Sequence, residues 1–401
     1  MEFRKYQRDI IEKGTNVIGE KKFVYLSMEV RTGKTLTSLG ILNNIGVKTV
    51  LFITKKKAID SIYDDFKLLD PVFSLLVVNY ESLHKVDQKG WDAIVCDEAH
   101  SMGAFPKPSK RAKQVKELII KNNPFVIFLS GTPTPESFSQ MYHQVYGLIQ
   151  SPFSKYTNFY KFAKNYVVPK TKRIGGFIVN DYSTGKQSIL DEMKPYSISY
   201  TQKEAGFKSK INEEVLYVNP PTMITDLCSK LKKDLVVEGK ENVMQKLHQM
   251  YSGTVKFESG KSMVLDTFKA QYIYDNFCTQ KIGIFYKFKE ELNAIKKVYG
   301  DNICTDLSTF ESTDKSIALQ IVSGREGISL KKADILLYYN IDFSATSYWQ
   351  SRDRMTTKDR PENKVVWIFT KGGIEPDIYK AVSKKKDYTL RHFKRDLLTL
   401  N

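Results

Sequence analysis

The sequence predicts an α/β fold in which two parallel-sheet lobes follow one another, with a small helical insertion between them. In the first 150 residues, short apolar runs alternate with stretches of helical periodicity, which is the pattern of strand-helix-strand units. The same alternation returns after residue 217, and 401 residues are enough for two or three domains. We therefore expect one lobe at 1–150, the insertion and linker at 151–217, and a second lobe at 218–401.

The composition favours a polyanionic partner. Lysine and arginine total 62 residues against 45 acidic ones, which gives a net charge of +17. A strongly basic protein attracts nucleic acid and repels acidic partners. The alternative is a lysine-rich surface that serves solubility alone, so the motifs have to decide between the two.

The cysteines indicate neither a disulfide framework nor a zinc site. The four of them lie far apart and form no C-x-x-C pair: Cys96, Cys228, Cys278 and Cys304. The start of the chain lacks the apolar core of a signal peptide, and no apolar run approaches the ~18 residues of a membrane span. We expect a cytoplasmic protein without a membrane partner.

The stretch SMEVRTGKT, Ser27–Thr35, has the order of elements that a phosphate-binding loop needs. An apolar run at Phe23–Leu26 predicts a buried strand before it, and leucines at helical spacing predict a helix after it: Leu36, Leu39 and Leu42. We expect Lys34 to reach the β and γ phosphates and the Thr35 hydroxyl to ligate Mg²⁺. The backbone N–H groups expected to cradle the phosphates belong to Arg31, Thr32 and Gly33.

A second glycine-lysine pair serves as a comparison. Ser259–Ser262 reads SGKS, but Val255 stands at its first-glycine position and the preceding residues predict a poor buried strand. We interpret this stretch as a loop or helix start without a phosphate site.

Two adjacent acids follow another predicted strand. The apolar run Trp91–Cys96 ends at Asp97 and Glu98. An acid at a strand end can hold Mg²⁺ beside phosphates, and its neighbour can orient or deprotonate the attacking water. We assign the first role to Asp97 and the second to Glu98, against the alternative of two ordinary surface acids.

Further apolar runs complete a predicted parallel sheet. These runs are Val50–Thr54, Leu75–Val78 and Phe125–Leu129, and helical stretches separate them. The last is followed by the small polar stretch Ser130–Pro133. In such a sheet the ligand crevice lies at the carboxyl ends of the strands, where both the phosphate loop and the paired acids are expected.

These elements, in this order, resemble the superfamily 2 helicases and translocases, most closely the Swi/Snf-type branch in a minimal form such as a phage encodes. Phe3–Gln7 resembles the opening motif, which implies that Gln7 reads adenine. SMEVRTGKT resembles motif I, which in this superfamily often lacks the first glycine, so Met28 is no objection. Asp97–His100 spells the DEAH form of motif II, and Leu129–Pro133 is similar to motif III.

The resemblance extends over the second half of the chain. Lys281–Phe288 is similar to motif IV, Gln320–Leu330 to motif V and Trp349–Arg354 to motif VI. It implies two RecA-like lobes with ATP and Mg²⁺ in the cleft between them. It further implies that Gly327 and Gln350 contribute to nucleotide binding.

The same resemblance implies a track for nucleic acid. Val50–Lys57 and Val78–Glu81 are similar to the DNA-contacting motifs Ia and Ib. With motifs IV and V, they place five residues near the predicted track: Lys55, Asn79, Tyr286, Lys287 and Ser323. Contacts of this kind act on the backbone and would make binding dependent on salt and nearly independent of sequence.

Motif VI departs from the pattern of the branch. Arg354 matches its first arginine, but the second, which stabilises the transferring phosphoryl group, is replaced by Thr357. Arg360, Lys358 or Arg352 could take its place, and the sequence does not choose among them. Arg354 is our main candidate and Arg360 the second.

The middle segment carries aromatic residues at helical spacing: Phe159, Phe162 and Tyr166. We expect them to pack a small accessory core rather than to stack on bases. Residues 187–217 resemble the linker between the lobes in the Swi/Snf branch, although Tyr200 and Thr201 stand where the family has paired arginines.

The prediction is an ATP-dependent DNA translocase or helicase in replication or recombination, acting on single-stranded, duplex or forked DNA with replication or recombination proteins as partners. The alternative is an ATP-regulated clamp that binds nucleic acid without moving along it. A GTPase is disfavoured because Val366 follows Asn363 and Lys364 where guanine selection needs an aspartate. A nuclease is disfavoured because we find no metal-binding cluster in the sequence beyond the nucleotide site.

Overall fold

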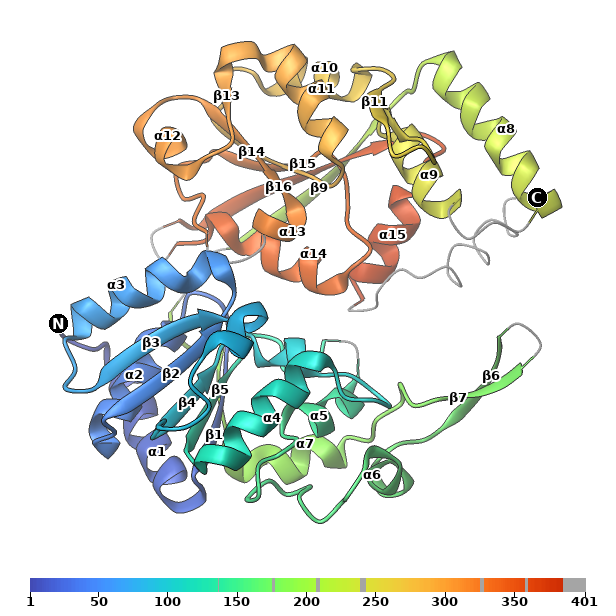
Figure 1. Cartoon of the computed structure of the whole chain (residues 1–401). Coiled ribbons are helices and arrows are strands. Elements are labelled where there is room, and N and C mark those ends of the chain that lie inside the picture. The colour runs from blue at the N-terminus through green and yellow to red at the C-terminus, as the bar shows by residue number, and fades with distance from the viewer. Residues whose placement is uncertain are drawn as a thin grey trace. The chain divides into compact units, whose positions relative to one another are not determined.

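A computed structural model describes residues 1–135, 137–174, 177–206, 210–238, 243–324, 328–357 and 360–384. The chain divides into two compact units, Met1–Gly206 and Phe207–Asn401. Each unit is built on a parallel sheet with helices on both faces (Figure 1). The predicted fold class, two tandem RecA-like α/β lobes, is confirmed.

The first unit holds a parallel sheet of strand order β3-β2-β4-β5-β1-β8. Its strands are β1 (Phe23–Met28), β2 (Thr49–Thr54), β3 (Ser74–Asn79), β4 (Ala93–Cys96), β5 (Phe125–Leu129) and β8 (Ser197–Tyr200). Its helices are α1 (Lys5–Lys21), α2 (Lys34–Ile45), α3 (Ile59–Leu69), α4 (Lys110–Asn122), α5 (Met141–Gln144), α6 (Phe159–Tyr166) and α7 (Ser188–Met193). Short 3-10 turns η1 (Lys56–Ala58), η2 (Tyr80–Lys85) and η3 (Ala99–Met102) follow β2, β3 and β4.

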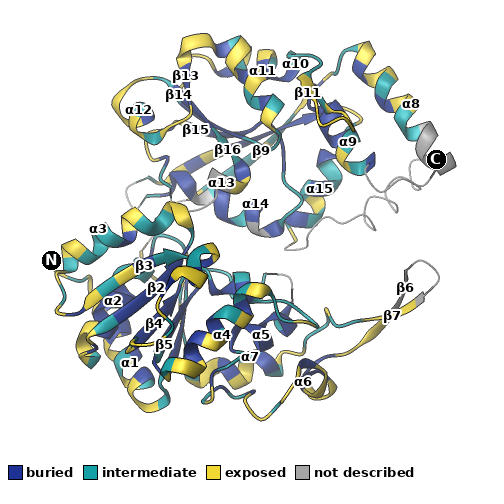
Figure 2. Cartoon of the chain, viewed as in Figure 1, coloured by how far each residue is buried: buried dark blue, intermediate teal, exposed yellow. Residues whose placement is uncertain are grey.

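Alternation along the strands builds a core on each face of the first sheet. On β1, Phe23 and Tyr25 pack with α4, α6 and α7, whereas Val24 and Leu26 pack with α1, α2 and α3. A strand buried on both faces reads as a continuous apolar run, which is why the predicted strands of this unit are all found. The outer faces of the helices are exposed (Figure 2).

The segment between the predicted lobes does not form a body of its own. Phe159, Phe162 and Tyr166 are buried, but in the main core of the first unit rather than in the small accessory core that we expected. The segment also contains the antiparallel hairpin β6 (Lys170–Ile174) and β7 (Phe177–Asp181), which the helical prediction did not include. Its remainder is shared, since β8 joins the first sheet and β9 (Lys210–Val218) joins the second. The division between the units therefore lies at Gly206 rather than at the ends of 151–217.

The second unit holds a parallel sheet of strand order β13-β14-β12-β15-β16-β9. Its strands are β9 (Lys210–Val218), β12 (Ile282–Tyr286), β13 (Ile303–Cys304), β14 (Ser316–Gln320), β15 (Ile335–Tyr338) and β16 (Glu362–Thr370). Its helices are α8 (Thr222–Glu238), α9 (Val243–Tyr251), α10 (Phe268–Phe277), α11 (Lys289–Tyr299), α12 (Leu307–Ser312), α13 (Ile321–Gly324), α14 (Ala345–Ser351) and α15 (Glu375–Val382). The turn η7 (Arg352–Met355) follows α14, and β10 (Thr254–Lys256) pairs with β11 (Ser262–Val264) as a hairpin.

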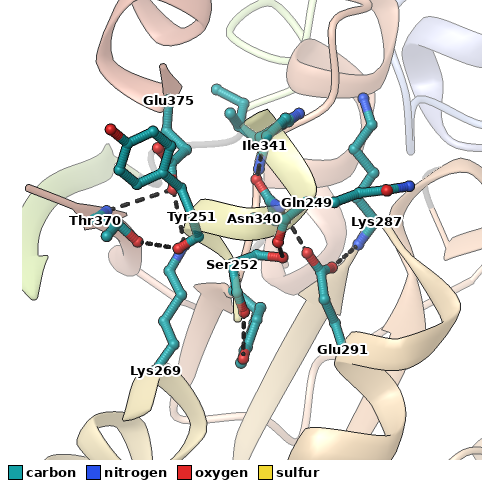
Figure 3. Close-up of polar contacts among 12 residues, drawn as sticks. Gln249, Tyr251, Ser252, Lys269, Lys287, Glu291, Asn340, Ile341, Thr370 and Glu375 are labelled. Carbon is teal, nitrogen blue, oxygen red and sulfur yellow. Dashed lines mark hydrogen bonds and ion pairs between the residues drawn. The ribbon is translucent and has the colours of Figure 1, made fainter. Parts of the chain in front are cut away.

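A buried polar network fixes one end of the second sheet (Figure 3). The Glu291 carboxylate accepts hydrogen bonds from Asn340 Nδ2 (2.6 Å) and from the main-chain N–H groups of Lys287 (2.7 Å) and Phe288 (2.9 Å). Asn340 Oδ1 in turn accepts from the Ile341 N–H (2.8 Å). Because Lys287 follows β12 and Asn340 follows β15, this network ties the carboxyl ends of two neighbouring strands together.

His248 on α9 belongs to this network as a neutral imidazole. It donates from Nε2 to Asn340 Oδ1 and is fully buried. Burial lowers its pKa well below the ordinary value, and the nearby charges of Lys287 and Lys269 act in the same direction. The second unit is therefore folded around a histidine that resists protonation.

We expect acid to destabilise the second unit through His248. Below about pH 6.5 the unfolded chain takes up a proton that the folded chain does not, so the free energy of unfolding falls by up to about 1.4 kcal/mol per pH unit from this residue. Urea unfolding between about pH 7 and pH 5, followed by tryptophan fluorescence, measures this slope. His248→Gln should reduce the slope, and an unchanged slope would contradict the assignment.

No helix in the described parts of the chain is both long enough and apolar enough to cross a membrane.

Candidate functional site

The predicted phosphate loop lies between β1 and α2, as the sequence indicated. α2 begins at Lys34, and Gly33 precedes it in the left-handed conformation (φ +79°). Arg31 is also left-handed (φ +63°), and the Thr32 N–H and hydroxyl donate to the Glu29 carbonyl. The loop thus turns sharply enough to present the N-terminus of α2, which is an anion-binding feature.

Gln7 lies against this loop. Its side chain is buried and accepts the Arg4 N–H at Oε1 (3.0 Å). A Cβ placed on Gly33 would come within 2.4 Å of Gln7 Nε2, so the two residues are in close contact. The residue predicted to read adenine and the loop predicted to hold the phosphates are therefore neighbours.

An alanine at Gly33 is expected to weaken nucleotide binding by about 10-fold or more, because the new methyl group collides with Gln7 and the left-handed backbone disfavours it. Fluorescent ADP titration measures the loss. Gly46→Ala is the matched control. Gly46 also has a positive φ (+70°), but a Cβ at this position would meet no atom within 4 Å. Equal affinities of the two variants would show that the close packing at Gly33 is irrelevant to binding.

The paired acids lie at the carboxyl end of β4, next to β2. Asp97 Oδ2 accepts a hydrogen bond from the Thr54 hydroxyl (2.8 Å), and the Asp97 carbonyl accepts from the Tyr80 hydroxyl (2.7 Å). Burial, and then the Glu98 charge, raise the pKa of the Asp97 carboxyl to about 6, while the Lys34 charge lowers it. The Lys34 charge therefore favours the ionised form of Asp97.

The residues present fit a magnesium ion. Asp97 and Glu98 are adjacent, partly buried carboxylates, and the raised pKa of Asp97 means that a cation beside it would favour its ionised form. Oxygen donors are also what Mg²⁺ prefers. Asp97 and the Thr35 hydroxyl are the candidate ligands. When bound, the metal would neutralise charge on the phosphates.

Residues after β5 link the acids to the loop. His100 Nδ1 lies 2.9 Å from the Ser130 hydroxyl and 3.2 Å from Glu98 Oε2. A Cβ on Gly131 would lie 3.7 Å from Lys34 Nζ and 3.5 Å from the Met28 carbonyl. The predicted motifs I, II and III therefore meet at one edge of the first sheet.

In the second unit, Arg354 lies on η7 against the residues that precede β15. Its Nε donates to the Gln350 carbonyl (3.0 Å) and its Nη1 to the Ile328 carbonyl (3.3 Å). Both Arg354 and Gln350 are buried. Gly327, the third predicted nucleotide residue of this unit, lies outside the described residues.

The structure shows the contacts of two of the three residues considered as replacements for the second arginine of motif VI. Arg360 donates to the carbonyls of Ala333 (2.6 Å) and Asp334 (2.7 Å), at the amino ends of β15 and β16. This is the edge opposite the one where ligands of parallel sheets bind, so Arg360 has a structural role here and the predicted displaced finger has no support. Arg352 pairs with Glu213 and lies 3.9 Å from the Trp349 ring. Lys358 is outside the described residues.

Lys55 and Asn79 lie together in the first unit. β2 and β3 are paired with Thr54 opposite Asn79, so Lys55 follows at the same edge. Asn79 Nδ2 donates to Glu81 Oε2 (3.1 Å). Their shared position at the carboxyl ends of neighbouring strands agrees with a common nucleic-acid surface.

Tyr286, Lys287 and Ser323 lie at the carboxyl ends of β12 and β14, which pair with Tyr286 opposite Gln320. Lys287 is engaged within the second unit. Its ammonium forms an ion pair with Asp342 (2.8 Å), with about 12% of the side chain exposed, and lies 3.6 Å from the Phe343 ring. The side chain of Ser323 is outside the described residues.

Sequence reasoning missed Glu213 on β9. Its carboxylate accepts from the Tyr348 hydroxyl, Trp367 Nε1 (2.9 Å) and the Tyr379 hydroxyl (3.2 Å), in addition to Arg352. It therefore holds the motif VI segment to the sheet. The sequence did contain a signal of this role. Side chains alternate along a strand, so Glu213 lies on the same face as the apolar residues Ile211 and Val215, where an acid is unusual.

Taken together, the fold and the first site define a class of protein with two parallel α/β units, the first of which carries a phosphate loop beside paired acids. A family model described as the SNF2-related domain matches residues 47–258, just over half of the chain. The chain belongs to this SNF2-related family.

Two solved structures to which the chain is similar come from Sulfolobus solfataricus. The SWI2/SNF2 ATPase core in complex with dsDNA is 15% identical, with a TM-score of 0.44, and the match covers 96% of this chain and 91% of that one. The SWI2/SNF2 ATPase core domain is 16% identical, with a TM-score of 0.43, and the match covers 96% and 89%. No curated protein matches the sequence.

Proposed function

We propose that the protein is an ATP-dependent DNA translocase or helicase that remodels DNA during replication or recombination. The observation that supports it best is that the phosphate loop packs against Gln7 and beside Gly131, with Asp97 at the same edge of the sheet. Membership of the SNF2-related family supports the same assignment. The Sulfolobus structure described as bound to dsDNA makes duplex DNA the first substrate to test.

Each residue of the site has a chemical role in this proposal. The loop and the N-terminus of α2 bind the phosphates, Lys34 neutralises their charge, and Gln7 contacts the adenine edge. Glu98 orients the attacking water and accepts its proton. Asp97 and Thr35 would hold Mg²⁺.

The second unit completes the reaction in our proposal. Arg354 stabilises the charge that develops on the γ-phosphate, in the manner of an arginine finger. Hydrolysis and product release then change how the two units engage DNA, which moves the protein along the strand. The proposal includes a phage-encoded enzyme of the host cytoplasm, as the family resemblance implied.

ATP hydrolysis with different polymers tests the proposal. The assay uses the full chain without nucleic acid and with single-stranded DNA, duplex DNA, forked DNA or RNA. We expect one DNA form to stimulate turnover strongly, and displacement of a triplex strand to require ATP. Hydrolysis that ignores every polymer would contradict the proposal.

A regulated clamp is the second candidate, and one observation favours it. Thr357 replaces the second arginine of motif VI, and Arg352 and Arg360 are both engaged elsewhere. A clamp would bind DNA more tightly with ATP and show no triplex displacement.

We expect Lys55→Ala to weaken DNA binding in a salt-dependent way. Loss of one phosphate contact should lower the slope of log affinity against log salt by about 1, with similar effects on every sequence. Fluorescence anisotropy over a salt series measures it. Lys13→Ala, an exposed lysine on α1, is the control, and identical slopes for both variants would remove Lys55 from the track.

A further inference from the structure

The turn after β8 lies beside the phosphate loop. β8 is the edge strand of the first sheet and pairs in parallel with β1, with Tyr200 in register with Met28. Because the two strands run in the same direction, the chain leaves both at the same edge. The first unit ends at Gly206, so this turn is its last part before the chain enters the second unit.

Three hydrogen bonds join the turn to the start of the loop. The Glu29 N–H donates to the Tyr200 carbonyl (3.0 Å), and the main-chain N–H of Gln202 donates to Glu29 Oε2 (2.7 Å). Gln202 Nε2 donates to the Val30 carbonyl (3.0 Å). Gln202 thus contacts two successive loop residues, Glu29 through its main chain and Val30 through its side chain, from 173 and 172 positions away.

An aromatic pair supports the same contact. The rings of Tyr6 and Tyr200 are stacked, with centroids 4.7 Å apart and an angle of 13° between planes. The Tyr6 hydroxyl donates to the Thr32 carbonyl (3.0 Å). The helix that carries Gln7, the loop and the turn are therefore packed as one assembly.

The turn is fixed by its own hydrogen bonds. The Glu204 carboxylate accepts from the Thr201 N–H (2.7 Å) and the Thr201 hydroxyl (2.8 Å). The Tyr200 hydroxyl donates to the Glu204 carbonyl (2.9 Å). Gln202 is therefore presented to the loop by a rigid support.

The loop requires such support. Arg31 has a left-handed backbone, which non-glycine residues adopt only where surrounding contacts hold them. Gln202 binds Glu29 and Val30, the two residues directly before Arg31. Its hydrogen bonds therefore act at the point where the chain enters the unfavourable conformation.

We infer that Gln202 is a positioning residue that holds the phosphate loop in its nucleotide-binding form and ties that form to the segment leading into the second unit. This inference deepens the proposed function and rests on it. Residues 203–206 are the covalent connection from Gln202 toward the second unit. Movement of the second unit when it binds DNA therefore changes the Gln202 contacts. Nucleotide affinity and DNA binding are coupled through this segment.

Gln202→Ala tests the inference in the full chain. Loss of one hydrogen bond should weaken fluorescent ADP binding and raise the KM for ATP by about 2- to 10-fold, with little change in kcat. Duplex DNA should change ADP affinity less in this variant than in the wild type. In the nucleotide-free chain, amide hydrogen exchange of residues 29–35 should rise.

A second substitution and a control sharpen the result. Gln202→Glu places a carboxylate against the Val30 carbonyl and the Glu29 carboxylate, and should weaken ADP binding more than Gln202→Ala does. Lys203→Ala changes an exposed neighbour on the same turn and should behave as wild type. Loop exchange and ADP affinity equal in Gln202→Ala and Lys203→Ala would overturn the inference.

Failure of the proposed function has a different signature. In that case the wild type would bind ADP but show no DNA-stimulated hydrolysis, or would bind no nucleotide. The hydrogen-exchange comparison does not depend on either activity. It therefore decides whether Gln202 positions the loop.

Discussion

Replacing Lys34 with alanine is expected to reduce ATP turnover by at least about 10²- to 10³-fold while the fold remains intact. Lys34 Nζ makes a long contact with the Glu29 carbonyl (3.5 Å), so its loss removes little from the folded state. In the transition state the same ammonium faces developing phosphate charge. Its removal also leaves Asp97 without the charge that lowers its pKa, which weakens the metal site further.

The chain contains its own control for this experiment. Gly260–Lys261 repeats the glycine-lysine pair, but Gly260 (φ +85°) lies in the turn of the hairpin β10–β11, where Phe257 and Lys261 are hydrogen bonded. Strand, loop and helix do not follow in order there, as the sequence indicated. Lys261→Ala should therefore keep wild-type turnover at saturating DNA. A similar loss in both variants would mean that the assay reports general lysine charge rather than a phosphate loop.

The central strands were predictable because they are buried on both faces. The strands β1, β2, β4, β5, β12 and β15 read as apolar runs bounded by turns, whereas β9 is partly exposed and carries Asn212, Glu213 and Glu214. The boundary between units was less predictable. Ser197–Tyr200 and Lys210–Val218 are neighbouring strands in sequence, yet they belong to different sheets, and periodicity alone does not assign a strand to a sheet.

The candidate site was predictable where it is local. The phosphate loop and the paired acids each lie within a few residues of a strand end, so a motif carries their geometry. Lys287 shows the limit of this reasoning. Its partner, Asp342, lies 55 residues away, and the sequence could not show that the ammonium was already paired. Gln202 and Glu213 were missed for the same reason, because their contacts come from tertiary structure.

Replacing the arginine proposed to act on the γ-phosphate should have the other large effect on turnover. We expect Arg354→Ala to lower kcat by about 10³-fold or more at saturating ATP and DNA, because it removes the group proposed to stabilise the transferring phosphoryl group. Its present partners are the carbonyls of Gln350 and Ile328, so the variant also loses two hydrogen bonds. Thermal unfolding and ADP affinity, measured in parallel, separate a catalytic loss from a structural one.

Arg360→Ala is the matched comparison, because it also removes a guanidinium from main-chain carbonyls of the second unit. Its contacts lie at the amino ends of β15 and β16, so we expect reduced thermal stability with turnover within about 2-fold of wild type. If Arg360→Ala instead loses turnover while Arg354→Ala keeps it, the displaced finger predicted from Thr357 would be restored. If neither variant loses turnover, hydrolysis does not depend on an arginine of this segment, and the ATP-regulated clamp becomes the better description of the second unit.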